Sequence, residues 1–425
     1  MGIVNNHSNH SIGPLDSTTL IRGVYRSLMN TGRTYAGFET RHMSWVDSLR
    51  DRKEVLDPMA GYGGLMQHCC QRTPPLSTFG IECNPPSYLW QVLTNPGHSQ
   101  IINGLCGNIL ANHLKWPRQR LDVVISDSWF PEESLNMLES LWHTVYNTTK
   151  VLVGVQAEEI ALSLLLPFVG RLSSTIQGSN AIHVKQGGLC VYKGWRDDFK
   201  RYLNRLKQTV ISPSCSCGGT HVIQLGDARN IQLGGKRFDA MFTSPPYPNR
   251  GDYSKIFAPE NHFLQWLNNR DLISSDFILS ARLIGGVDVS ESGRDLHRAP
   301  VSIKSKSAND FLKFIEDYRG TAKAQSDNKV YYLPYYQNYF HGLELAYENI
   351  ATYLSSSFLG YIVVVNNTAR KRVIPVDKFI CETWKRLGFQ TEIVDVREMA
   401  HLGGINPRVK GLSARHAEYT IKVQR

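Results

Sequence analysis

The chain has 425 residues, of which 42% are hydrophobic and 20% are charged, and these proportions exclude intrinsic disorder and the fibrous classes. A formal net charge of +10 is compatible with a polyanionic partner. No signal peptide or apolar stretch of membrane-spanning length is recognised, and the eight scattered cysteines indicate reduced thiols, so we expect a cytoplasmic protein without a membrane partner.

The first clear motif is EVLDPMAGYGGLMQH, residues 54–68. A strand is expected to end at Asp57, and Gly61 and Gly63 predict a tight loop before a helix. Glycine tolerates positive φ and lets the backbone approach a ligand closely. A second strand follows in GIECNP, residues 80–85, with Glu82 at its tip, where a carboxylate can accept both ribose hydroxyls of a nucleoside cofactor. The alternative for Glu82 alone is a solvated strand end.

Residues 105–215 show weaker patterns. LDVVISDSWF, residues 121–130, is typical of a strand and competes with FDAMFTSPP for the fourth strand of the sheet; we favour the later segment. Residues 192–208 predict a basic amphipathic helix, which suits contact with phosphates, although an exposed helix packed on the core fits equally well. The basic residues considered for DNA contact are Lys200, Arg201 and Arg205.

HVIQLGDARNI, residues 221–231, predicts a further strand with Asp227 at its end. GNIL, residues 107–110, is a rival for the same role through Asn108, and we rank it lower. Cys215, Cys217 and His221 are spaced too closely for an ordinary zinc site, so this stretch is interpreted as a Gly-rich linker and no metal is expected.

The segment FDAMFTSPPYPNRGDY, residues 238–253, combines a buried strand with an abrupt proline turn. Two successive prolines cannot continue a sheet ladder, so they form a stiff turn at the carboxyl end of the strand. The turn presents the Ser244 hydroxyl, proline carbonyls and the Tyr247 ring. Those groups can hold a planar base that carries an amino group, by hydrogen bonds and by stacking. The alternative is a proline-rich turn that only ends a core strand.

These motifs carry a resemblance to a known family. SPPY resembles motif IV of the amino-directed DNA methyltransferases, and Asp-Pro-x-x-Gly-x-Gly at residues 57–63 resembles their motif I, which cradles S-adenosyl-L-methionine. The resemblance covers most of residues 50–105 and 220–425. It implies an α/β, Rossmann-like methyltransferase with a seven-stranded mixed sheet and a largely helical insertion. The implied division is a lead-in with the cofactor loop (1–104), the insertion (105–215) and the part with the catalytic turn (216–425).

The resemblance also implies an activity: methyl transfer from S-adenosyl-L-methionine to N4 of cytosine in double-stranded DNA by base flipping. Within this family Ser-Pro-Pro-Tyr is associated mainly with cytosine N4, and Asp- or Asn-Pro-Pro-Tyr mainly with adenine N6. The protein would modify DNA in a restriction-modification system, acting at the prokaryotic nucleoid without a stable complex with its endonuclease. An N6-adenine enzyme, an RNA methyltransferase and an inactive nucleic-acid-binding module remain as alternatives.

The implied site residues fall into three groups. The catalytic residues are Ser244, Pro245, Pro246 and Tyr247. The cofactor-binding residues are Asp57, Pro58, Gly61, Gly63, Glu82, Asp227 and Tyr35, of which Asp227 would accept from the adenine amino group. The DNA-binding residues are Arg250, Lys200, Arg201 and Arg205.

Overall fold

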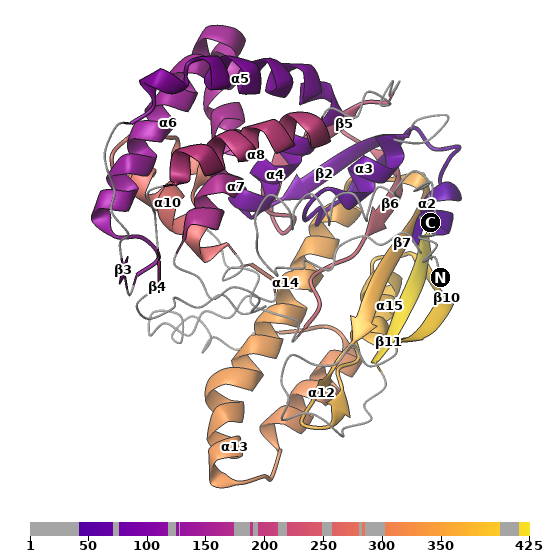
Figure 1. Ribbon diagram of the computed structural model, residues 1–425. Helices are drawn as coiled ribbons and strands as arrows, with labels where there is room; N and C mark the ends of the chain where they lie inside the picture. Colours follow the sequence, from indigo (N-terminus) through magenta and orange to yellow (C-terminus); the bar gives the residue numbers. More distant parts are fainter. Residues whose placement is uncertain are drawn as a thin grey trace, which may run out of the picture.

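The structure is a computed structural model that describes residues 42–70, 76–117, 125–126, 128–173, 188–189, 194–210, 219–248, 257–279, 283–284, 302–399 and 416–425. They form a central sheet with helices on both faces and a separate group of helices beyond one end (Figure 1). Tyr35, Arg250, Cys215 and Cys217 lie outside the described residues.

The central sheet has seven strands in the order β10-β11-β7-β6-β1-β2-β5. β7, β6, β1, β2 and β5 run parallel, whereas β11 is antiparallel to both β7 and β10. This is the Rossmann-like methyltransferase fold with a mixed sheet that the resemblance implies. The strands are β1 (Glu54–Asp57), β2 (Ser77–Glu82), β5 (His221–Leu225), β6 (Phe238–Thr243), β7 (Leu354–Asn366), β10 (Gln390–Met399) and β11 (His416–Gln424).

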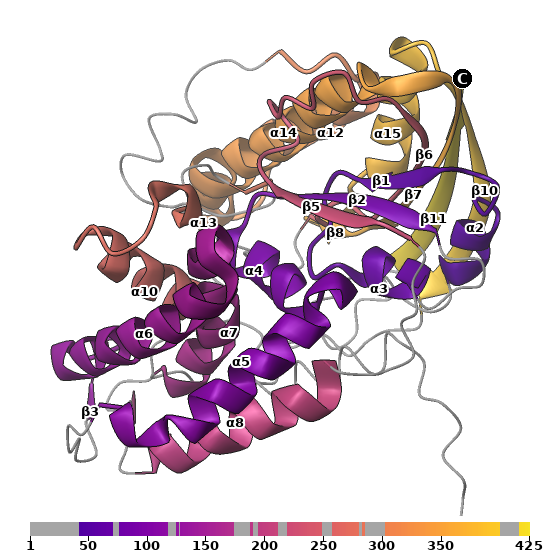
Figure 2. The ribbon, with the colours of Figure 1, turned by 90° about the horizontal axis from the view of Figure 1, so that it is seen from above.

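The central strands are apolar on both faces because both faces are covered by helices. Successive side chains of a strand point to opposite faces. Accordingly, Val55 of β1 and Ala240 of β6 belong to one core, whereas the adjacent Leu56 and Met241 belong to the other. One face carries α2 (Met43–Asp47) and α3 (Gly64–Cys70), and the other carries α12 (Lys306–Glu316), α14 (Leu333–Ala351) and α15 (Val376–Arg386) (Figure 2).

Most of the remaining helices form a helical lobe with its own apolar core, inserted mainly between β2 and β5 (Figure 2). Its core extends beyond residues 105–215, because helices that follow β2 and β6 also contribute side chains to it. The lobe therefore packs from two separate segments of chain. Its helices are α4 (Pro85–Thr94), α5 (Ser99–Ala111), α6 (Glu132–Val153), α7 (Ala157–Leu172), α8 (Trp195–Val210) and α10 (Ala258–Asn268), with the short turns η2 (Pro96–His98), η3 (His113–Lys115), η4 (Gly154–Gln156) and η5 (Ser275–Phe277).

Strand pairing shows which of the two candidate segments, 121–130 or the one that begins at residue 238, forms the fourth strand of the sheet. β6 lies between β1 and β7 in the central sheet, which confirms the choice of the later segment. Within the earlier segment, β3 (Ile125–Ser126) pairs with β4 (Gly188–Leu189) in a separate two-stranded sheet. The elements not yet named are α13 (Ala322–Asp327), η6 (Asn328–Tyr332), β8 (Thr368–Ala369) and β9 (Arg372–Val373).

Two further expectations from the sequence concern the cysteine thiols and the absence of an apolar stretch of membrane-spanning length. Cys70 is disulfide-bonded, so the expectation of reduced thiols is wrong for this residue. Glu132–Gly170, which comprises α6 and most of α7, is long and apolar enough to cross a membrane by length and composition. However, 56% of its most apolar window is buried inside the protein, and core helices of soluble proteins share these properties.

Candidate active site at the carboxyl edge of the sheet

The candidate residues gather where parallel strands end. β1 ends at Asp57, β2 at Glu82 and β6 at Thr243, while Asp227 follows β5 by two residues. Because these strands run in the same direction, their carboxyl ends share one edge of the sheet. Open α/β sheets bind ligands in the crevice outside this edge. The fold therefore brings the glycine loop, the acidic strand tip and the SPPY turn to the same edge.

The glycine loop after β1 is held tightly by its neighbours. Gly61 and Gly63 have φ values of 55° and 75°, the left-handed region in which glycine is favoured. The Gly61 N–H donates to Glu82 Oε2 at 2.7 Å, and the Gly61 carbonyl accepts from Gln91 Nε2 at 2.7 Å. A Cβ on Gly63 would lie 2.9 Å from Gln91 Cγ. Gln91 of α4, which sequence reasoning missed, thus packs against this loop.

Glu82 is a buried carboxylate that the main chain holds in place. Its Oε2 accepts from Gly61, and its Oε1 accepts the Asn84 N–H at 2.8 Å. Burial raises the pKa of Glu82 from its ordinary 4.5 to about 8, with a further contribution from the charge of Asp57. The hydrogen bonds that it accepts oppose this rise but do not cancel it. Glu82 is therefore not a solvated strand end.

Asp57 connects the glycine loop to the strand that carries the SPPY turn. Its Oδ1 accepts from Thr243 Oγ1 at 2.8 Å and from the Met59 N–H at 3.2 Å. Burial raises the pKa of Asp57 from 3.8 to about 7. Thr243 immediately precedes Ser244 and is fully buried, so this bond joins the glycine loop and the SPPY turn directly. Pro58, the next residue of the loop, is also buried.

The two raised pKa values predict a pH-dependent stability. Between the ordinary and the raised values, the folded chain holds more protons on Asp57 and Glu82 than the unfolded chain does. The free energy of unfolding contributed by these groups therefore falls as pH rises from about 4.5 towards 8. Chemical unfolding from pH 5 to 9 should show Glu82→Gln gaining stability relative to the wild type, by at most about 1.4 kcal/mol per pH unit. A difference that is independent of pH would contradict the assignment.

Several polar atoms of the SPPY turn after β6 form hydrogen bonds. Ser244 Oγ and Tyr247 Oη are 2.9 Å apart, within hydrogen-bond distance. Tyr247 is 6% exposed in this conformation. The hydroxyl of Tyr339, on α14, donates to the Pro246 carbonyl at 2.9 Å, and Asn367 Nδ2 donates to the Pro248 carbonyl. The turn is thus supported by two side chains from other elements.

Tyr339 and Asn367 were not identified from the sequence as site residues. Tyr339 lies in the tyrosine-rich stretch 331–353, for which core packing was the favoured interpretation, and it is indeed 1% exposed. Asn367 directly follows β7, at the same carboxyl edge. The only available signal was the position of Asn366 and Asn367 at the end of an apolar strand, where polar side chains reach the edge of the sheet.

Asp227 has a partner within the protein. Arg229 Nε donates to both carboxylate oxygens of Asp227 at 2.9 Å, and the Arg229 N–H donates to Oδ1 at the same distance. The pKa of Cys83 is raised, mainly by burial and then by the charges of Glu82 and Asp227. Asp227 therefore lies near the Glu82 tip, but Arg229 already uses its carboxylate.

The predicted basic helix exists as α8, and its two faces differ as the pattern indicates. Trp195, Phe199 and Leu206 lie in the core of the helical lobe. Lys200 is 4.0 Å from Asp197, and Arg201 pairs with the buried Asp198. These ion pairs reduce the positive charge that the helix presents. Arg201 and Arg205 are exposed.

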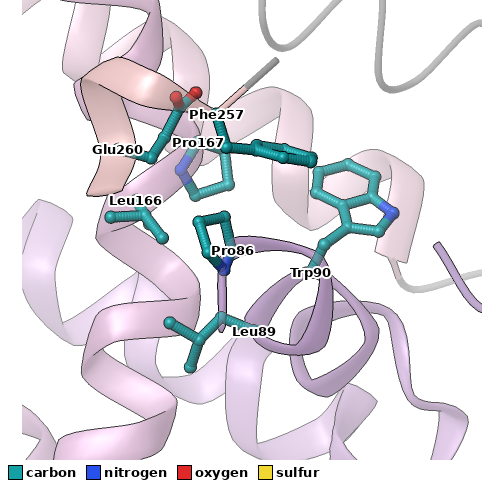
Figure 3. A pocket seen from close by; sticks show the side chains of 7 residues that line it. All are labelled: Pro86, Leu89, Trp90, Leu166, Pro167, Phe257 and Glu260. Carbon is teal, nitrogen blue, oxygen red and sulfur yellow. The ribbon is translucent and has the colours of Figure 1, made fainter. Parts of the chain in front are cut away.

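An apolar pocket lies between α4, α7 and α10 of the lobe (Figure 3). Phe257 and Trp90 line it, and the ring of Tyr62 from the glycine loop contacts both, with centroid distances of 5.6 and 6.4 Å. The loop is thereby joined to the lobe as well as to the sheet. The pocket is lined by Pro86, Leu89, Trp90, Leu166, Pro167, Phe257 and Glu260.

Comparisons with known proteins identify no family for the chain. No family model matches the chain, and no curated protein matches it. Two solved structures of the rRNA methyltransferase aviRa from Streptomyces viridochromogenes, at 1.5 Å and 2.4 Å, are similar with TM-scores of 0.31 and 0.29 and 9% sequence identity. The similarity covers 97% of this chain and 95% and 94% of those chains. At these values the strand order described above, and not this comparison, carries the fold assignment.

Proposed function

We propose that the protein transfers a methyl group from S-adenosyl-L-methionine to an exocyclic amino nitrogen of a nucleic-acid base, with N4 of cytosine in double-stranded DNA as the target. The observation that carries the proposal is the hydrogen bond between Thr243 and Asp57. It ties the SPPY turn to the glycine loop at the edge where this fold binds ligands. A cofactor on the loop and a base on the turn would then meet.

The residues at the edge fit the cofactor chemically. S-adenosyl-L-methionine carries ribose hydroxyls, an ammonium group and a sulfonium, which are hydrogen-bond donors or positive charges. The edge of the sheet carries the complementary groups, the carboxylates of Asp57 and Glu82, which can accept hydrogen bonds and carry negative charge. Both are buried, and burial raises their pKa values to about 7 and about 8. A ligand with donors and positive charge would stabilise their ionised forms. Glu82 would accept the ribose hydroxyls, and the 57–63 loop would approach the rest of the cofactor.

The bound cofactor would supply an electrophilic methyl group: the C–N bond would form as the methyl–sulfur bond breaks, S-adenosyl-L-homocysteine would leave, and the amino group would release one proton to water. The protein needs no covalent intermediate for such a transfer, so positioning and electrostatics carry the rate. Ser244 Oγ and the Pro245 carbonyl would accept hydrogen bonds from the target amino group and direct its lone pair to the methyl group. Tyr247 would stack on the flipped base, and its ring would have to become accessible from its present 6% exposure.

The test is direct identification of the methylated nucleoside. Purified protein is incubated with labelled S-adenosyl-L-methionine and, separately, with duplex DNA and with ribosomal RNA, and the digested nucleosides are identified by mass spectrometry. N4-methylcytosine in DNA is the expected product. N6-methyladenine in DNA would move the target base but keep the reaction, and methylated RNA alone would overturn the DNA assignment. Absence of any methylated product would favour the alternative that the protein is an inactive nucleic-acid-binding module.

We also propose that the helical lobe contacts DNA. A protein of a modification system acts on duplex DNA and therefore needs a surface that binds it. Replacing Lys200, Arg201 and Arg205 with Ala should weaken DNA binding and reduce the slope of log K against log salt by roughly one per lost phosphate contact. The affinity for the cofactor should not change. Fluorescence anisotropy over a salt series measures the slope.

The matched control removes three exposed basic residues elsewhere, so that the net charge changes equally. Arg50, Lys306 and Arg397 are exposed and lie outside the lobe. If this control lowers the salt slope as much as the α8 variant does, the effect comes from total charge. In that case α8 has no specific role in DNA binding.

A further inference from the structure

The proline turn after β6 has an unusual supply of hydrogen-bonding groups. Pro245, Pro246 and Pro248 have no N–H, so the turn loses three main-chain donors within four residues while it keeps every carbonyl. It cannot be held by ladder hydrogen bonds of its own. Apart from the contact between Ser244 and Tyr247, hydrogen bonds that hold the turn come from donors on other elements, which act on its carbonyls.

Two such donors are present, and each acts on one proline. Tyr339 extends from α14 to the Pro246 carbonyl, and Asn367, after β7, reaches the Pro248 carbonyl. Both side chains are well buried, at 1% and 7% exposure. The Asn367 main chain is fixed as well, because its carbonyl accepts the Ile374 N–H at 2.8 Å. The supports of the turn are thus rigid parts of the sheet and of a helix packed against it.

The Pro245 carbonyl is different. Pro245 is buried, and within the described part of the chain no donor lies within hydrogen-bond distance of its carbonyl. Main-chain carbonyls of buried residues are nearly all satisfied by a donor in native proteins. A ligand amino group would satisfy this one.

From these contacts we infer that Tyr339 and Asn367 are positioning residues: they occupy the Pro246 and Pro248 carbonyls and hold the turn so that Pro245 presents its carbonyl to the target amino group. The inference rests on the proposed function for the identity of that amino group. Neither residue touches the reacting atoms. They act by fixing the position of the Pro245 carbonyl and by limiting its movement.

The test compares two identical substitutions on one helix. Tyr339→Phe removes the hydroxyl that holds Pro246 and keeps the buried ring. Tyr347→Phe makes the same change eight residues further along α14, where the tyrosine is also fully buried but its hydroxyl has no hydrogen-bond partner among the described residues. Asn367→Ala removes the second support. The rate of methyl transfer should fall about tenfold in Tyr339→Phe and in Asn367→Ala, as for one lost hydrogen bond, and stay unchanged in Tyr347→Phe.

Two readouts separate positioning from a general loss of structure. The KM for DNA and the dissociation constant for S-adenosyl-L-methionine should stay within about twofold, because the lost interaction orients the acceptor and does not bind either ligand. Hydrogen exchange of a peptide covering 238–248 should be faster in Tyr339→Phe and Asn367→Ala than in the wild type and Tyr347→Phe. Exchange is measured on the free protein and needs no activity.

The outcomes are distinct. If the wild type transfers methyl groups but Tyr339→Phe behaves like Tyr347→Phe in rate and exchange, the inference is wrong and the proposed function stands. If the wild type transfers no methyl group to DNA or RNA, the proposed function fails, and exchange alone decides whether these residues hold the turn. Unchanged exchange would then overturn the inference as well.

Discussion

Gly61→Val is expected to weaken binding of S-adenosyl-L-methionine about a hundredfold, from two physical effects that add. The φ of 55° at Gly61 is a conformation that a β-branched residue adopts only at a cost of roughly 1–2 kcal/mol. A shift away from it would also break the hydrogen bond from the Gly61 N–H to the buried Glu82, at a cost of about 1–3 kcal/mol. Isothermal titration calorimetry measures the loss.

Gly154→Val is the matched control. Gly154 has a similar φ of 63°, and no atom of the described residues lies within 4 Å of the Cβ that would be added there. It lies between α6 and α7 in the helical lobe. The control should therefore suffer comparable backbone strain and lose some stability, with its affinity for the cofactor preserved. Equal affinities of the wild type and Gly61→Val would refute the assignment of the glycine loop.

Ser244→Ala is expected to lower turnover by one to two orders of magnitude, with cofactor binding intact. The variant removes the acceptor that would draw the target amino group into line, and it also removes the partner of the Tyr247 hydroxyl. Single-turnover methyl transfer, with the cofactor saturating, reports the step. Ser356→Ala is a suitable control, because Ser356 is exposed near the amino-terminal end of β7, away from the carboxyl edge.

Tyr247 variants separate the hydroxyl from the ring. Tyr247→Phe keeps the ring that would stack on the base but loses the contact with Ser244, so it should cost less than Tyr247→Ala. If Ser244→Ala and Tyr247→Ala both leave turnover unchanged while cofactor binding persists, the SPPY turn is a structural end of β6 and catalysis lies elsewhere.

For the helical lobe, sequence patterns predict the faces of a single helix but not the extent of the lobe. Periodicity in residues 192–208 correctly predicts the buried and exposed faces of α8, because amphipathicity is a local property of the helix. The extent of the lobe is not local. Helix α10 packs against α4 and α7, residues far away in the sequence, and no spacing within either segment encodes that contact. The same holds for the disulfide at Cys70, which depends on a second cysteine being brought near.

The sequence by itself determined the strand pattern, the glycine loop and the proline turn, since each depends on residue types within a few positions of one another. It also placed Asp57, Glu82 and Ser244 at strand ends, and parallel strands then bring them to one edge. Only the tertiary structure decided which side chains support them. Thr243 binds Asp57 across 186 residues, Tyr339 reaches Pro246 across 93, and Asn367 reaches Pro248 across 119. Such pairings follow from the order of strands in the sheet, because that order and not the chain sets which side chains become neighbours.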